Sequence, residues 1–93
     1  MLYNITLSLE AEDDILNAYL WYEQQRPGLG KEFTDALEHS FLSIQSNPET
    51  YGFRKKNVRG HLVKRFPYLI LFLIEGIDVR VISIFHTHRR PAM

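Results

Sequence analysis

YLILFLIEGIDVRVISIF, residues 68 to 85, is the stretch of sequence that decides the fold. Its first part, Tyr68 to Ile74, is apolar throughout, which is typical of a central strand covered on both faces. Residues 75 to 78 (EGID) predict a hairpin loop, because glycine supplies the positive φ that such loops need. Val79 to Phe85 then returns as a second strand, so the whole stretch predicts an antiparallel hairpin.

Two more strands are predicted from alternating polarity. Residues 2 to 8 (LYNITLS) alternate between apolar and polar side chains, with Tyr3, Ile5 and Leu7 on the apolar side. This period of two indicates a half-buried strand. His61 to Phe66, directly before the hairpin, alternates weakly and predicts a further strand. The last three strands then form a meander.

The segment between these strands predicts two amphipathic helices. The first runs from about residue 9 to about residue 25, capped by Ser8, whose hydroxyl can accept from amides of the first turn. Pro27 to Gly30 breaks it, because proline lacks an amide hydrogen and glycine permits the turn. The second begins near Lys31 and ends at Asn47-Pro48. The apolar faces consist of Ala11, Ile15, Ala18 and Tyr22 in the first helix and of Phe33, Leu37, Phe41 and Ile44 in the second.

The element order is therefore β-α-α-β-β-β, and residues 1–93 form a single domain. We expect an α+β fold in which the helical hairpin packs on a small, largely antiparallel sheet. Phe33, Leu37 and Phe41 should face this sheet, opposite Leu71 and Leu73 or their neighbours.

The net charge of zero conceals a strong separation of charge along the chain. Residues 1–50 contain two basic and nine acidic residues, a net charge of −7, and residues 51–93 contain nine basic and two acidic residues, a net charge of +7. The second half is therefore suited to bind an anion, such as nucleic acid or an acidic partner. The alternative is that acidic helices pack beside a basic sheet and the two charges neutralise each other.

Composition excludes several classes of protein. Cysteine is absent, so the chain has no disulfide framework and no thiolate metal site, and we expect neither a metal nor another cofactor. The longest apolar run, Tyr68 to Ile74, is far too short to cross a bilayer. The N-terminal residues lack the basic start and the apolar stretch of a signal peptide. We therefore expect a cytoplasmic protein that has no membrane partner.

Three stretches of the chain resemble the RelE/ParE superfamily of type II toxins. They are WYEQQRPGLGKEF (Trp21 to Phe33), VRGHLVKRFPYLILFLI (Val58 to Ile74) and VRVISIFHTHRRP (Val79 to Pro91). The combination of Phe66-Pro67-Tyr68 with a later His-x-x-Arg-x-Pro, which begins at His86, is the more specific part of the resemblance.

The resemblance implies a cytosolic toxin that is neutralised by an antitoxin encoded beside it. Some members of the superfamily cut messenger RNA on the ribosome, and others poison DNA gyrase without being enzymes. The leading hypothesis is ribosome-dependent cleavage of messenger RNA. The alternatives are a gyrase poison whose acidic, aromatic helical hairpin contacts the target, and an inactive relative that only binds an antitoxin.

Cleavage of RNA by its own 2′-hydroxyl needs a base, an acid, and cations that stabilise the charge on phosphorus. Histidine suits either proton role, and arginine suits the third because its planar fork grips two phosphate oxygens. The expected catalytic residues are His86, Arg65 and Arg89. The residues expected to bind RNA phosphate are Arg59, Lys64, Arg54, Lys55 and Lys56.

Several of these residues also have a structural interpretation. His86 can be a histidine at a strand end that bonds to backbone, and the run Arg54-Lys55-Lys56 can be a solvated face. Trp21, Tyr19 and Tyr22 could stack on bases, but their helical phase favours the seam between the helical hairpin and the sheet.

Overall fold

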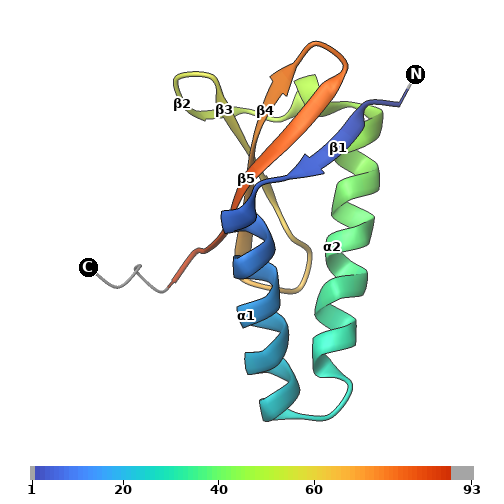
Figure 1. Cartoon of the computed structure of the whole chain (residues 1–93), viewed down its shortest axis with the longest axis vertical. Coiled ribbons are helices and arrows are strands. Elements are labelled where there is room, and N and C mark those ends of the chain that lie inside the picture. Colours follow the sequence, from blue (N-terminus) through green and yellow to red (C-terminus); the bar gives the residue numbers. More distant parts are fainter. Residues whose placement is uncertain (1, 89–93) are drawn as a thin grey trace.

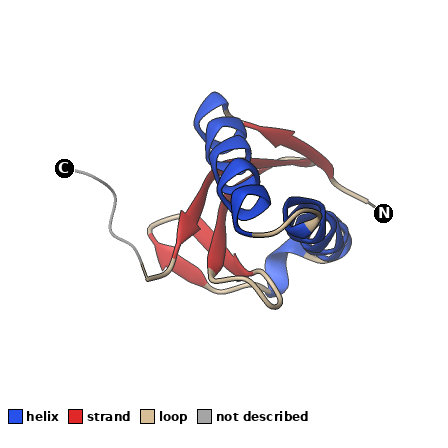
Figure 2. Cartoon of the chain, turned by 90° about the horizontal axis from the view of Figure 1, so that it is seen from below, coloured by secondary structure: helices blue, strands red, loops and turns tan. Residues whose placement is uncertain are grey.

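The computed structural model describes residues 2 to 88 of the chain. A helical hairpin packs on one face of a five-stranded sheet with strand order β1-β5-β4-β3-β2 (Figures 1 and 2). β1 is parallel to β5, and the other neighbouring strands are antiparallel. The predicted fold class is confirmed. The elements are β1 (Asn4–Leu7), α1 (Leu9–Gln25), α2 (Leu29–Ser46), the 3-10 helix η1 (Pro48–Thr50), β2 (Phe53–Lys55), β3 (Val58–Leu62), β4 (Tyr68–Glu75) and β5 (Asp78–His86).

The two helices begin and end where local chemistry directs. The backbone N–H of Ala11 donates to the Ser8 hydroxyl at 3.0 Å, which is the predicted N-cap of α1. Between the helices Gly28 adopts a φ of 91°, which glycine tolerates without strain. The Glu23 carboxylate accepts from the N–H groups of Gly28 and Gly30 at 3.0 and 2.9 Å, so it satisfies free amides at the start of α2.

The structure differs from the sequence-based expectation in the region before β4. β2 was not predicted, because its three residues are all exposed and show no alternation. β3 ends at Leu62, so the strand predicted from His61 to Phe66 is misplaced. The chain turns back instead, with Arg65 at a φ of 76° and with the Val63 N–H donating to the Tyr68 carbonyl at 2.9 Å.

The core lies between the helical hairpin and the inner face of the sheet. Phe33, Leu37 and Ile44 of α2 are buried as predicted, whereas Phe41 is only partly buried. The residues of β4 opposite the helices are Ile70 and Phe72, both fully buried, which are the neighbours of Leu71 and Leu73 that the prediction allowed. β4 is a central strand as predicted, but its outer face is only half-buried, whereas cover on both faces was expected.

No helix in the part of the chain that the structure describes has the length and apolar character needed to span a bilayer.

Candidate functional site

A hollow of 470 Å³ lies between α1 and β5, and we call it the α1–β5 pocket. Its described walls contain two carboxylates, three aromatic rings, a serine and the predicted catalytic histidine. These residues are Glu10, Asp14, Trp21, Tyr68, Phe85, Ser83 and His86. Lysine and arginine are absent from its walls among the described residues.

His86 is the last residue of β5 and pairs across the sheet with Tyr68, the first residue of β4. The two rings meet edge to face, with centroids 5.0 Å apart. The backbone N–H of His88 donates to Nδ1 of His86 at 3.1 Å, so the neutral ring carries its proton on Nε2. The strand end therefore fixes both the position and the tautomer of this ring.

Asp14 joins α1 to β5 at the wall of the same pocket. One carboxylate oxygen, Oδ2, accepts from the Ser83 hydroxyl at 3.2 Å and from the Ile84 N–H at 2.9 Å. The pocket that contains His86 thus has a fixed acidic wall.

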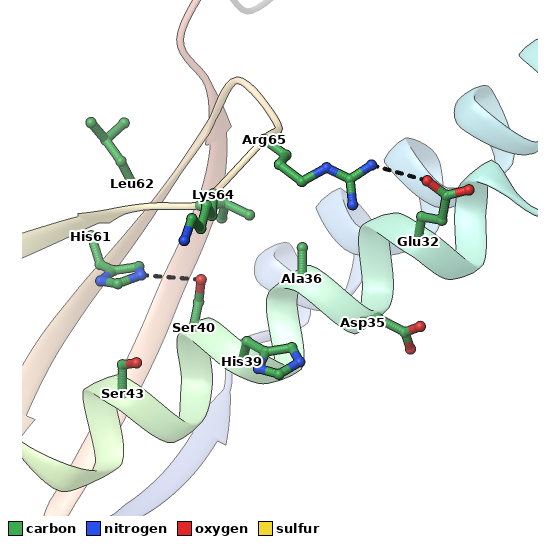
Figure 3. A pocket seen from close by; sticks show the side chains of 11 residues that line it. Glu32, Asp35, Ala36, His39, Ser40, Ser43, His61, Leu62, Lys64 and Arg65 are labelled. Carbon is green, nitrogen blue, oxygen red and sulfur yellow. Dashed lines mark hydrogen bonds and ion pairs between the residues drawn. The ribbon is translucent and has the colours of Figure 1, made fainter.

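A second hollow, of 720 Å³, lies between residues 32–43 of α2 and residues 61–65, and we call it the α2–β3 groove (Figure 3). Arg65 and Lys64 line it. The Arg65 guanidinium donates to Glu32 at 3.1 Å, and Arg26 donates to the other oxygen of Glu32 at 3.0 Å. Hydrogen bonds from Arg26 and then from Arg65 lower the pKa of the Glu32 carboxyl. Arg65 is therefore committed to an ion pair with α2.

His61 and Ser40 meet on the floor of this groove. The distance between His61 Nε2 and the Ser40 hydroxyl oxygen is 3.1 Å, and Ser40 is only 5% exposed. His61 also packs edge to face against the Tyr51 ring, with centroids 4.7 Å apart. Its Nδ1 atom is buried without a hydrogen-bond partner, and burial lowers the pKa of the ring.

Arg59 binds to the chain itself. Its Nη1 donates to the carbonyl oxygens of Glu49 and Tyr51 at 3.1 and 2.8 Å, and its guanidinium carbon lies 4.0 Å from the centroid of the Phe53 ring. This arginine ties the segment after α2 to β3. The contacts account for its position without any ligand.

The predicted basic run lies along β2 and the turn that follows it. The Arg54 side chain covers Gly60, where an added Cβ would come within 2.8 Å of its Cγ and Nε atoms. Arg54 and Lys55 line a third hollow, of 360 Å³. Lys56 adopts a φ of 45° in the turn and is exposed.

The predicted site residues therefore lie in separate places. Lys64 and Arg65 line the α2–β3 groove, Arg54 and Lys55 line the third hollow, and His86 lines the α1–β5 pocket. The predicted catalytic Arg89 lies outside the described residues. Within residues 2–88, there is no group of three His, Asp or Glu side chains that could hold a metal ion.

Two features were missed in the sequence. Asp14 was not singled out in the sequence, although its position one turn after Ala11 on α1 places it beside β5. The contact between Ser40 and His61 joins residues 21 positions apart, and no local sequence pattern predicts it. A serine on the buried face of a helix was the one available signal, because a buried hydroxyl requires a partner.

Comparison with known proteins identifies the fold. The chromosomal ParDE toxin–antitoxin system of P. aeruginosa contains a chain that superposes with a TM-score of 0.82 at 14% identity, covering 94% of this chain and 98% of that one. The E. coli RelBE toxin–antitoxin complex gives a TM-score of 0.69 at 15% identity, covering 94% and 99%. The RelBE2 complex of Mycobacterium tuberculosis gives 0.63 at 14% identity, covering 92% and 99%.

These identities are low, so the superpositions show a shared fold. None of the curated proteins compared with the chain matches it. The family model described as "ParE toxin of type II toxin-antitoxin system, parDE" matches residues 5–91, which is nearly the whole chain. The chain therefore belongs to the family of ParE toxins of type II toxin–antitoxin systems.

Proposed function

We propose that this toxin acts in the cytoplasm as a non-enzymatic poison of DNA gyrase and is neutralised by an antitoxin encoded next to it. The observation that carries the proposal is the charge of the α1–β5 pocket. His86 shares this pocket with Glu10 and Asp14, and its described walls contain no lysine or arginine. A phosphate within about 4 Å of one carboxylate near a protein surface is repelled by about 4 kcal/mol. The described walls thus disfavour RNA at His86.

The positions of the other cations support the same proposal. Arg59 is bound to backbone carbonyls and Arg65 is paired with Glu32. Holding phosphate would require each guanidinium to leave these partners, and Arg59 would also leave the ring of Phe53. Binding of phosphate would therefore break contacts that these two arginines already make.

The exposed surface of α1 suits a protein target. Leu9, Leu16 and Leu20 lie at positions i, i+7 and i+11 on one stripe of the helix and are 80%, 54% and 48% exposed. Glu12 and Asp13 lie beside this stripe and are exposed. An exposed apolar stripe with a polar rim is typical of a protein interaction surface. We propose that it contacts gyrase.

Ribosome-dependent cleavage of messenger RNA is the second candidate. The hydrogen bond from the His88 N–H to His86 favours it, because this bond holds the ring in a single tautomer, as a proton-transfer role requires. Under this function, His86, Arg65 and Arg89 would act at the scissile bond, with Arg59, Lys64, Arg54, Lys55 and Lys56 holding phosphate. A third candidate is an inactive relative that retains only antitoxin binding.

A supercoiling assay with purified gyrase, run beside mapping of messenger RNA ends in a translating extract, tests these functions. We expect lost supercoiling with accumulated DNA breaks, and intact messenger RNA. Leu20→Glu should abolish gyrase inhibition, because it places a charge within the apolar stripe. Ile77→Glu is the matched control, since Ile77 is also exposed (60%) but lies in the β4–β5 loop.

His86→Ala separates the two active candidates. Gyrase inhibition should be unchanged in this variant, whereas loss of a positioned acid or base would lower RNA cleavage by about 10²- to 10⁴-fold. Cleaved messenger RNA together with unaffected gyrase would contradict the proposal. No effect on either target from folded protein would support the inactive relative.

A further inference from the structure

The face of the sheet that points away from the helices, which we call the outer sheet face, carries a row of uncovered apolar side chains. Leu62 of β3 pairs with Leu69 of β4, and Leu69 pairs with Phe85 of β5, so the three side chains lie beside one another. Leu62 is 58% exposed and Phe85 is 37% exposed. Ile70, the next residue of β4, is fully buried in the core, and side chains alternate along a strand, so the row belongs to the outer face.

Basic side chains border this apolar row. Leu71, two residues after Leu69 on the same face, lines the third hollow together with Val58, Arg54 and Lys55. Both cations are exposed, and neither makes an ion pair within residues 2–88. Among the described residues that line this hollow, Glu10 is the one carboxylate. The outer sheet face is therefore apolar with a mainly basic border.

The helical side of the molecule has the opposite combination. The exposed leucine stripe of α1 lies on the side of the helix opposite to Ala11 and Ala18, which are buried in the core. The stripe therefore points away from the sheet, on the far side of the molecule from the outer sheet face (Figure 2). Glu12 and Asp13 beside it are exposed and make no ion pair in the part of the chain that the structure describes. The stripe is therefore apolar with an acidic border.

These two surfaces cannot meet within one molecule, but each complements the other in a second copy. The net charge of zero leaves no overall repulsion between copies near pH 7. The net charges of −7 for residues 1–50 and +7 for residues 51–93 form a dipole. Two such dipoles attract each other most strongly when they align head to tail, because unlike charges then lie closest together.

We infer that the outer sheet face of one copy binds the leucine stripe of α1 in a second copy, head to tail. The two surfaces that meet are different, so each added copy leaves one surface free for a further copy, and association continues beyond the dimer. This self-association does not depend on the target of the toxin. It also covers the stripe that we propose contacts gyrase, and only this consequence rests on the proposed function.

Sedimentation velocity of the purified full chain measures the association. Because the apolar contact is small, we expect a dissociation constant on the order of 10–100 μM. At about 0.1 M salt the weight-average mass should rise with concentration and exceed that of a dimer. At about 0.5 M salt it should fall toward the 11.0 kDa of the monomer, because screening weakens the attraction between the two borders.

Two single substitutions test the two surfaces separately. Leu20→Gln changes the stripe and Leu62→Gln changes the outer sheet face, and each replaces an exposed leucine with an uncharged side chain of similar size. Either change should weaken association at least about tenfold, because an apolar contact is lost. Ile77→Gln is the matched control, since Ile77 is 60% exposed but lies in the β4–β5 loop, and it should associate as the wild type does.

A mixture of the two variants tests the head-to-tail arrangement. Leu20→Gln retains an intact outer sheet face, and Leu62→Gln retains an intact stripe, so one wild-type contact can form between them. We expect each variant alone to be largely monomeric and the mixture to form a heterodimer with wild-type affinity that does not grow further. Because the heterodimer requires both variants to be folded, its formation also shows that neither substitution prevents folding.

Three outcomes would overturn the inference. The first is a wild-type chain that stays monomeric as its concentration rises. The second is wild-type association that stops at a dimer, together with a mixture that associates no better than either variant alone, because the contact would then join like surfaces. The third is wild-type association in both Leu20→Gln and Leu62→Gln, which would place the interface elsewhere. Failure of the gyrase proposal would change none of these results, since the toxin is the sole protein in the experiment.

Discussion

His61 is a titratable residue placed where a charge is unfavourable. Its ring lies between Ser40 and Tyr51, and its buried Nδ1 has no acceptor for a second proton. Burial lowers the pKa of the ring, so the folded chain keeps it neutral. In the unfolded chain the same ring has its ordinary pKa of about 6.5.

This difference predicts a loss of stability in mild acid. Below about pH 6.5 the unfolded state binds the proton first, so the free energy of unfolding falls as pH falls toward the lower pKa of the folded state. The loss attributable to His61 is at most about 1.4 kcal/mol per pH unit, which corresponds to one proton. Urea unfolding between about pH 7.5 and 5.5 measures this slope across the interval around the ordinary histidine pKa.

His61→Asn should flatten the slope, because it removes the titrating group while keeping a side chain that can bond to Ser40. His39→Asn, at an exposed position on α2, is the control and should leave the slope unchanged. Equal slopes in wild type and His61→Asn would show that another group causes the pH dependence.

At the scale of the elements, α2 packs against the sheet and against α1 through a narrow row of buried side chains. Phe33 is fully buried and contacts the rings of Tyr22, Phe66 and Tyr68, with centroids 5.2 to 5.4 Å apart. Phe41, on the same predicted face, is only partly buried, because the helix turns Ser40 toward β3 instead.

Truncation at these two positions should therefore differ in cost. Phe33→Ala should lower the free energy of unfolding by about 3–5 kcal/mol, a large fraction of the stability of a domain of this size. Phe41→Ala should lower it by about 1–2 kcal/mol, since part of its ring already contacts water. Chemical denaturation of both variants measures the difference. A larger loss of stability for Phe41→Ala than for Phe33→Ala would contradict the face of α2 that is described here as packing against the sheet.

The elements that could be predicted from the sequence are those whose apolar side chains recur at regular spacing. Both helices and the β4–β5 hairpin show regular apolar spacing, and their positions are confirmed within a few residues. β2 shows no alternation of apolar and polar side chains, so it could not be predicted. The left-handed φ of Arg65 is rare outside glycine, so the end of β3 could not be predicted either. The site was harder to predict. Residue type was enough to single out His86, Arg59 and Arg65 as candidates. The groups that these side chains contact depend on the topology of the fold, which the sequence pattern does not show.

At the scale of the whole molecule, the separation of charge survives folding. Arg65–Glu32 is the one ion pair among residues 2–88 that joins the acidic first half to the basic second half. The acidic residues belong mainly to α1 and α2, and the basic residues belong mainly to β2, β3 and the turns beside them. Ion pairs among the described residues therefore neutralise little of the charge of the two halves, which leaves an acidic helical side and a basic sheet side.

This distribution predicts that antitoxin capture is steered by charge. Raising ionic strength from about 0.1 M to about 0.5 M should lower the association rate constant roughly tenfold, because screening shortens the reach of the basic surface. The dissociation rate should change much less. Lys55→Gln and Lys56→Gln, two exposed positions, should reduce the salt dependence without affecting stability. Stopped-flow binding measures both rates, and an association rate insensitive to salt would contradict the steering.

The parallel pairing of β1 with β5 has a consequence for synthesis. Asn4 meets Asp78 across 74 positions of sequence, so β1 must wait for almost the whole chain before its partner strand exists. Pairing across such a distance is slow, because chain entropy is lost before any contact compensates for it. On the ribosome, the nascent chain can form its helical hairpin early but cannot close its sheet until β5 has been synthesised. The toxin can therefore acquire its native sheet only late in its own synthesis.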